Sequence, residues 1–366
     1  MTLAIHGSGS GYSQYWIDYC RRKNVPHKIV NCYDNDIVEQ VRDCSALLWH
    51  SSHSDPRDVI IARQILFAHE HAGLKVFPDF HMAWHFDDKV GQKYLFEALD
   101  IPRMRTYVFV ELGPALEWAT RTDYPKVFKL RHGASSSGVR LVRSERQARR
   151  IIKRAFWRGF SVYSPWVNLK ERYYAARLGT SDTVDVAKGF GRFLYPPRFS
   201  RVLGRQIGYV LFQDFAPGND SDVRIVVVGD KAFGARRWVR PGDFRASGSG
   251  RISYEPDQID VEYVALAFKL AKRLGCQCLA FDFVRKQDDS LAVTEVSYGF
   301  GWKGNSSGYW DSSLQWHARD YRPEEWMVDL VLESVNEGSM TGGPKRPLES
   351  GRPTSDGGRR ICNSDD

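Results

Sequence analysis

The sequence of 366 residues has few cysteines and no long hydrophobic run. Its six cysteines lack zinc-ligand spacing, because Cys276 and Cys278 stand two residues apart with no second pair, so we expect free thiols. No stretch approaches the roughly 18 apolar residues that span a bilayer, and no transmembrane segment is expected. The first residues also lack the basic and apolar parts of a secretory signal, which predicts a cytoplasmic protein.

Positive charge is plentiful but unevenly placed. The formal net charge is +8, and residues 131–210 alone carry 17 Lys and Arg against 4 Asp and Glu. We therefore expect this segment to meet an anionic ligand or substrate. It contains no recognisable nucleic-acid-binding motif, so nucleic acid is not an expected partner. Hydrophobic residues make up 42% of the chain, which is enough for the cores of two or three domains.

The first third of the chain alternates short apolar strands with helices. This pattern predicts a small parallel sheet with helices on its faces, with strands at 3–5, 27–30, 45–49 and 75–77 and helices at 15–22 and 57–72. Another helix opens at residues 87–89, with Asp87 as its expected N-cap. At the other end, residues 337–366 are rich in Gly, Ser, Pro and Arg, which predicts a disordered tail.

Two short apolar runs near the C-terminus each carry one carboxylate. Asp282 lies in the run 279–284 and Glu295 in the run 291–296, and a polar turn centred on residues 288–289 separates them. A hairpin about this turn pairs Asp282 directly with Glu295. Opposed residues have Cβ atoms roughly 5 Å apart on one face, where two negative charges repel.

A bound cation would relieve this repulsion. Oxygen ligands on a rigid hairpin suit Mg²⁺, which takes one or two carboxylates and completes its shell with water and phosphate oxygens. Ser297 falls on the same face and is a further candidate ligand. The alternative is a solvent-exposed acidic pair, but the apolar neighbours Ala280 and Val284 on the same face favour burial.

A second informative stretch is a lysine-bearing strand followed by a small-residue loop. Lys129 lies in the expected strand 125–130, and the loop spans residues 133–138, with Gly133, Ser135, Ser136, Ser137 and Gly138. Such a loop can bring backbone N–H groups close to phosphate oxygens, while the lysine supplies a fixed positive charge. An ordinary Gly/Ser hairpin turn would have the same composition.

Taken together, these features resemble the ATP-grasp superfamily, in its branch of ribosomal-protein glutamate ligases, D-alanine–D-alanine ligase and glutathione synthetase. The resemblance covers about residues 75–305. It rests on five pieces that occur in the order of the family: Asp88-Lys89 before Ile101-Pro102, Lys129 before the loop 133–138, residues 213–215 before Asp222 and Arg224, Arg237 with residues 242–245, and Asp282 with Glu295.

The resemblance implies a fold of mixed α/β and α+β class, in which two β-rich lobes enclose ATP behind a small parallel-sheet α/β domain. The implied divisions are a pre-ATP-grasp domain at 1–105, a central lobe with a basic lid region at 106–210, and a C-terminal lobe with the metal site at 211–336. The tail 337–366 follows them.

The resemblance also implies roles for individual residues. Lys89 and Lys129 would contact phosphates, and the loop 133–138 would close over them as a lid. Gln213, Asp214 and Phe215 would line the adenine, and Asp222 would lie near the ribose. Arg224, Arg237 and Arg245 would face the transferred phosphoryl group and the substrate carboxylate. Asp282, Glu295 and Ser297 would form the metal site.

The implied activity is an ATP- and Mg²⁺-dependent carboxylate–amine ligase that forms an amide through an acyl phosphate. Its acceptor would be acidic or anionic, such as a sugar acid, a peptide or a polymer. Two positions depart from the family pattern, because Ser247 and Ser297 stand where asparagine is usual. These departures leave open whether one or two Mg²⁺ ions bind, with Mn²⁺ as a substitute, and whether the protein is instead a nucleotide-binding module that has lost turnover. A separate alternative is a kinase that uses the same nucleotide site to phosphorylate a hydroxyl.

Overall fold

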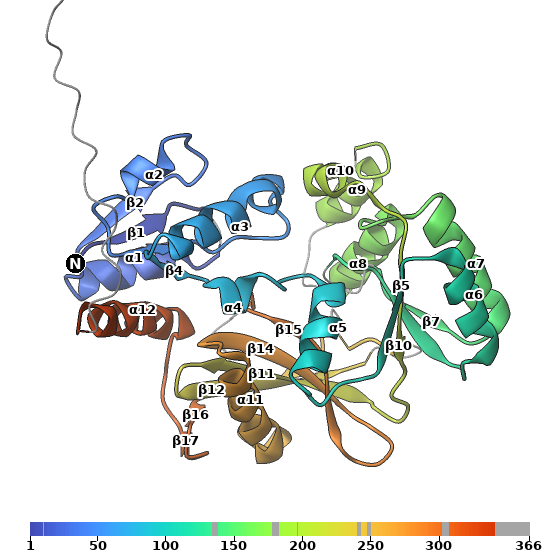
Figure 1. The fold of residues 1–366 in the computed structure, drawn as a ribbon. Helices are drawn as coiled ribbons and strands as arrows, with labels where there is room; N and C mark the ends of the chain where they lie inside the picture. The colour runs from blue at the N-terminus through green and yellow to red at the C-terminus, as the bar shows by residue number, and fades with distance from the viewer. Residues whose placement is uncertain are drawn as a thin grey trace, which may run out of the picture.

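The computed structural model describes residues 1–9, 11–133, 138–177, 183–195, 197–239, 243–246, 250–301 and 307–340. Three folded parts follow one another: an α/β domain with a parallel sheet and two lobes built on antiparallel sheets (Figure 1). This architecture confirms the predicted fold class. No helix in the described ranges is long and apolar enough to cross a membrane.

The N-terminal sheet has the strand order β2-β1-β3-β4, and every pair is parallel. Leu3 and Ile5 of β1 belong to one hydrophobic core and Ala4 to another, as expected for a sheet covered on both faces. The strands are β1 (Leu3–His6), β2 (His27–Val30), β3 (Ala46–Leu48) and β4 (Lys75–Phe77), and the helices are α1 (Ser13–Arg22), α2 (Ile37–Gln40), α3 (Pro56–His71) and α4 (Phe80–Ala83).

The central lobe contains the antiparallel sheet β5-β10-β6-β7. Its strands are β5 (Thr106–Phe109), β6 (Lys126–Lys129), β7 (Arg140–Val142) and β10 (Val210–Asp214), with α6 (Leu112–Arg121) and α7 (Glu145–Trp157) packed together. Because β10 lies between β5 and β6, residues 211–214 belong to this sheet. The expected boundary between residues 210 and 211 therefore falls too early.

The segment between α7 and β10 contains helices that the sequence pattern did not reveal. They are α8 (Pro165–Arg177), α9 (Thr183–Gly191) and α10 (Arg198–Leu203), and the short strands β8 (Phe160–Ser161) and β9 (Arg205–Gln206) pair with each other on either side of them. Contacts join α10 to α3, so this basic segment reaches the N-terminal domain.

The C-terminal lobe contains the largest of the described sheets, which has the strand order β15-β14-β11-β12-β16-β17, with β13 paired to β12. Its strands are β11 (Ser221–Val228), β12 (Lys231–Trp238), β13 (Ile252–Ser253), β14 (Cys278–Arg285), β15 (Leu291–Ser297), β16 (Tyr309–Asp311) and β17 (Trp316–His317). The 3-10 helix η1 (Pro256–Gln258) precedes α11 (Val261–Leu274), which contacts β11, β12 and β14. The aromatic stretch around residues 310–317 is thus a hairpin that extends the sheet.

Two helices join the lobes to each other and to the first domain. α5 (Lys89–Ala98) contacts β15, where the buried Gln92 side chain donates to the Val296 carbonyl at 2.8 Å and accepts from its N–H at 3.2 Å. α12 (Pro323–Met340) contacts α1 and β4. It extends four residues beyond the start of the expected tail at 337, and the remainder of that tail lies outside the described residues. The described cysteines form no disulfide, as predicted.

Candidate functional site

A cavity of about 350 Å³ lies between the two β lobes, with walls from β6 and β10 on one side and β11, β12, β14 and β15 on the other. It gathers every predicted site residue that the structure describes except Gly138: Lys89, Lys129, Gly133, Gln213, Asp214, Phe215, Asp222, Arg224, Arg237, Arg245, Asp282, Glu295 and Ser297. Gly138 instead packs on Leu130, where an added Cβ would come within 2.8 Å of the side chain. Ser135, Ser136, Ser137 and Ser247 lie outside the described residues.

The carboxylate hairpin has the predicted pairing at its functional end. Asp282 lies opposite Glu295, and Ala280 lies opposite Ser297. A β-bulge follows, so that Phe283 pairs with Val293 and the register toward the turn is one residue away from the predicted one. The extra residue is Thr294, whose hydroxyl donates to the Asp282 carbonyl at 3.1 Å.

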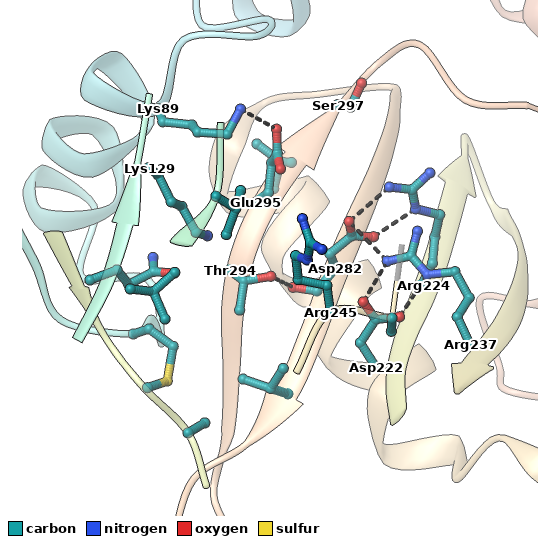
Figure 2. A pocket seen from close by; sticks show the side chains of 18 of the residues that line it. Lys89, Lys129, Asp222, Arg224, Arg237, Arg245, Asp282, Thr294, Glu295 and Ser297 are labelled. Atoms are coloured by element: carbon teal, nitrogen blue, oxygen red, sulfur yellow. Dashed lines mark hydrogen bonds and ion pairs between the residues drawn. The ribbon is translucent and has the colours of Figure 1, made fainter. Parts of the chain in front are cut away.

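Asp282 is neutralised by arginines of the neighbouring strands. Arg224 Nε and Nη2 donate to its two oxygens at 2.6 and 2.7 Å, and Arg237 Nη2 lies 3.1 Å from Oδ2 (Figure 2). Burial alone would raise the pKa of Asp282, but the two guanidinium groups outweigh burial and hold that pKa well below its usual range.

Glu295 points instead toward Lys89, whose Nζ lies 3.0 Å from Oε1 (Figure 2). The same ammonium lies 3.6 Å from Asp87 and donates to the Gly133 carbonyl at 3.1 Å. Burial would lower the pKa of Lys89, but the charges of Glu295 and Asp87 raise it above its usual value. The two opposed acids thus have separate cationic partners, and a metal ion is not needed to relieve their repulsion, contrary to the expectation from the sequence.

Lys129 differs from the other cations of the cavity. Within the described part of the chain, its ammonium makes no hydrogen bond or ion pair. Burial, together with the nearby charge of Lys89, lowers its pKa to about 8, while Glu295 and Asp282 act in the opposite direction. The Lys129 ammonium is therefore available to bind an anionic ligand.

Two further ion pairs lie on the C-terminal lobe. Asp222 accepts from Arg237 Nε and Nη2 at 2.6 and 2.8 Å, and burial raises the pKa of Asp222. Arg245 Nη2 lies 2.6 Å from Asp243, a carboxylate that the sequence interpretation did not single out. All three predicted arginines therefore carry a carboxylate partner in this structure.

The start of the glycine loop is fastened to the start of α5, which the sequence interpretation missed. Asp88, not Asp87, is the N-cap of α5, and it accepts from the N–H groups of Val90 and Gly91. Arg131 donates to both oxygens of Asp88 at 2.9 and 2.5 Å. Asp87 has a φ of 51°, which is unusual for a residue with a side chain, and its carboxylate accepts from the Gly133 N–H at 3.0 Å. In the sequence, the two adjacent aspartates before the helix were the only indication of these contacts.

The opposite end of the cavity is less charged. Gln213 Nε2 donates to Thr106 Oγ1 at 3.1 Å, and Asp214 is paired with Lys126 at 2.6 Å. Apolar residues that no motif identified complete this wall, among them Met104, Val127 and Phe244. An apolar wall with a few hydrogen-bonding groups is suited to a heteroaromatic ring.

The oxygen ligands of the cavity suit a single hard cation that takes most of its ligands from water and phosphate, rather than a metal enclosed by protein side chains. No group of three or more His, Cys, Asp or Glu side chains that could hold a metal exists among the described residues. Asp282 and Glu295 offer two carboxylates on one face, which suits a Mg²⁺ ion whose other ligands are phosphate and water oxygens. The Ser297 hydroxyl donates to the Gly299 carbonyl at 2.7 Å, which leaves a second ion poorly supported.

Comparisons with known proteins agree with this fold. Residues 200–308 match the RimK-like ATP-grasp domain. Among curated proteins, an uncharacterized protein of Mycoplasma pneumoniae, the MG012 homolog, is 31% identical over 88 residues. That match covers 24% of this chain and 31% of the relative, so less than a third of the relative's length is matched.

Three solved structures have a similar fold. A RimK domain ATP-grasp protein from Sphaerobacter thermophilus is 16% identical, with 91% of this chain and 100% of that chain covered and a TM-score of 0.50. The ATP-grasp ligase PsnB, complexed with a minimal precursor, Mg and ADP, is 13% identical, with 91% and 98% covered and a TM-score of 0.50. The D-cycloserine synthetase DcsG is 15% identical, with 92% and 100% covered and a TM-score of 0.53.

The chain therefore has the fold of ATP-grasp proteins. The part that builds most of the C-terminal lobe, residues 200–308, matches a RimK-like ATP-grasp domain.

Proposed function

We propose that this protein is an ATP-dependent, ADP-forming ligase that joins a carboxylate to an amine and uses Mg²⁺. The observation that carries the proposal is a single cavity in which two lysines, three arginines and two opposed carboxylates meet. Two of its structural neighbours are, by name, an ATP-grasp ligase bound to Mg and ADP and a D-cycloserine synthetase.

The nucleotide would span the cavity between the two lobes. Its phosphates would lie against Lys89 and Lys129, and its adenine against Gln213, Asp214 and Phe215 on β10 and its following loop. Asp222 would be near the ribose. Because Lys129 is the cation that has no partner among the described residues, we expect it to contribute most to phosphate binding.

The reaction needs no protein nucleophile. A carboxylate oxygen of the first substrate attacks the γ-phosphorus of ATP, the bond to the β,γ-bridging oxygen breaks, and ADP leaves with the electron pair. The amine of the second substrate then attacks the acyl carbon, phosphate leaves, and the nitrogen loses a proton to solvent. Arg224, Arg237 and Arg245 would bind the transferred phosphoryl group and the substrate carboxylate, because a guanidinium can engage either in bidentate fashion.

Asp282 and Glu295 would hold the metal. A bound Mg²⁺ neutralises the phosphate charge that builds up during transfer. The basic segment 131–210 and its contact with the N-terminal domain favour an anionic acceptor, which includes sugar acids, peptides and polymers.

Trapping of the acyl phosphate tests this function. The purified chain is incubated with ATP, Mg²⁺, hydroxylamine and a panel of carboxylates, and hydroxamate and ADP are measured, with Lys129→Met as the control for contaminating ligases. Formation of hydroxamate in equal amount to ADP supports the proposal. A stable phosphorylated product instead indicates a kinase, and ATP binding without ADP release under any acceptor indicates a nucleotide-binding module.

A further inference from the structure

A second cavity, of about 230 Å³, adjoins the first on the side of the N-terminal domain. The two cavities share the wall residues His53, Phe86 and Asp87. The other walls of this side cavity come from residues 51–52, α3, His132 and the end of α10. Its volume equals that of roughly eight water molecules in the liquid, which is the size of a small metabolite rather than of a nucleotide.

Asp58 of α3 is a buried carboxylate on this wall that has no ion-pair partner among the residues the structure describes. Its residue is 8% exposed, and within the described ranges its two oxygens accept hydrogen bonds from neutral groups, the Tyr33 hydroxyl at 2.7 Å and the Ser52 N–H at 2.6 Å. A carboxylate has about four acceptor positions, so capacity remains for another donor. Among the described residues no ion pair involves Asp58. Burial raises its pKa, and the hydrogen bonds from Ser52 and Tyr33 and the charge of Arg57 offset burial only in part.

Arg63 lies on the same helix and lines the same cavity. One of its N–H groups donates to the Phe86 carbonyl at 2.5 Å, and in the described ranges the guanidinium has no carboxylate partner. The side cavity thus displays one anion and one cation that do not neutralise each other. Unpaired opposite charges in a partly enclosed space are suited to a ligand that carries both complementary charges.

We propose that the side cavity binds a small zwitterion of the amino-acid class, with Asp58 facing its ammonium group and Arg63 facing its carboxylate. This inference rests on the proposed function, because an amino acid held beside the nucleotide cavity is a substrate of the ligase. Asp58 and Arg63 determine which substrate is recognised, whereas the lysines and arginines of the first cavity act on the nucleotide and on the reacting groups.

The shared wall supports this assignment. Asp87, which closes the side cavity, also accepts from the Gly133 N–H at the mouth of the first cavity, and His132 Nδ1 lies 2.8 Å from the Asp87 carbonyl. A ligand in the side cavity is therefore separated from the nucleotide cavity by a single layer of side chains rather than by a domain core.

The test measures binding of defined probes to the full chain by calorimetry, with saturating Mg·ADP. The probes are the standard L-amino acids and their D enantiomers, together with two analogues of alanine that lack one charge each: propanoate, without the ammonium, and ethylamine, without the carboxylate. The variants are Asp58→Asn, Arg63→Gln and the control Arg21→Gln, which removes the same charge from the same domain at an exposed residue outside the cavity.

We expect at least one amino acid to bind the wild type, and each single-charge analogue of alanine to bind roughly tenfold more weakly than alanine. Asp58→Asn and Arg63→Gln each lower the affinity for the preferred amino acid by about tenfold, the size of one lost charge-assisted hydrogen bond, and Arg21→Gln does not. If Asp58→Asn fails to fold, Arg63→Gln and the analogue series decide whether the side cavity binds the amino acid.

Absence of amino-acid binding, or wild-type affinity in both cavity variants, overturns this inference when Mg·ADP still binds. Absence of Mg·ADP binding to the wild-type chain overturns the proposed function itself, so the two failures are distinguishable.

Discussion

Replacement of Asp282 by alanine tests whether the ion pairs of the cavity stabilise the protein. If repulsion between Asp282 and Glu295 dominated, loss of either acid would leave the fold intact or stabilise it. The structure predicts the reverse for Asp282, which is 9% exposed and accepts from both Arg224 and Arg237. Removal of one partner from a buried ion pair costs about 3–5 kcal/mol, because the other charge is left buried and unpaired.

The structure places Asp282→Ala at the lower end of this range. Arg237 keeps Asp222 as a partner, and the Arg224 side chain, at 29% exposure, can reach solvent. We therefore expect a loss of about 3 kcal/mol in the free energy of unfolding. Glu295→Ala should cost only about 1 kcal/mol, because the Glu295 side chain is 33% exposed and Lys89 retains Asp87 and the Gly133 carbonyl.

Urea unfolding followed by tryptophan fluorescence, without Mg²⁺, measures both variants. The pH dependence gives a second readout. The folded-state pKa of Asp282 lies below its unfolded value, so its contribution is fully present above about pH 5 and is lost as the pH falls toward 2. The difference between wild type and Asp282→Ala should shrink over that window. An Asp282→Ala protein as stable as the wild type at pH 7 would refute the ion-pair account.

Four further outcomes follow from the contacts. Because the pKa of Lys129 is about 8, calorimetric affinity for ADP should fall roughly tenfold from pH 7 to pH 9, but stay level in Lys129→Arg; parallel profiles would contradict this. Asp88→Ala should lower the melting temperature more than Asp88→Asn, since asparagine still caps α5. Asp88→Asn removes only the ion pair, so it should lower the melting temperature about as much as Arg131→Gln, and equal decreases for Asp88→Asn and Asp88→Ala would contradict the capping role. Gln92→Leu should cost about 2–4 kcal/mol in urea unfolding, because the Val296 N–H and carbonyl lose their partner; a cost below 1 kcal/mol would count against the bridge. Mg²⁺ should bind the chain at least about tenfold more tightly with ADP than alone in calorimetric titrations, and equal affinities would show that the carboxylates are available without the nucleotide.

Much of the C-terminal lobe could be predicted because its signals are local. Two short apolar runs indicated β14 and β15, and the polar turn between them set Asp282 opposite Glu295. The bulge at Thr294 was missed because an extra residue in one strand leaves both apolar runs in place. Its effect is a one-residue shift in register near the turn, where no predicted site residue lies.

The features that were missed depend on long-range pairing. Nothing in residues 210–214 indicates that this strand pairs with β5 (Thr106–Phe109) and β6 (Lys126–Lys129), which lie far earlier in the chain. The ion pairs of Arg224 and Arg237 depend in the same way on the neighbouring strands β11, β12 and β14. Between residues 165 and 203, α8 has no apolar stripe, and α10 is only six residues long, so neither helix has a clear apolar period.

The ion pairs of the cavity constrain how a nucleotide and a metal could bind. Arg224, Arg237 and Lys89 carry carboxylate partners, and Asp282 and Glu295 are those partners. A Mg²⁺ ion alone would have to displace these groups, so that Arg224 would lose its carboxylate partner, and Arg237 and Lys89 would each keep only one, Asp222 and Asp87. A nucleotide supplies phosphates to these cations, so the released carboxylates become available for the metal in the same exchange. The charge arrangement therefore favours entry of nucleotide and metal together, with Lys129, which has no partner among the described residues, as the first contact for phosphate.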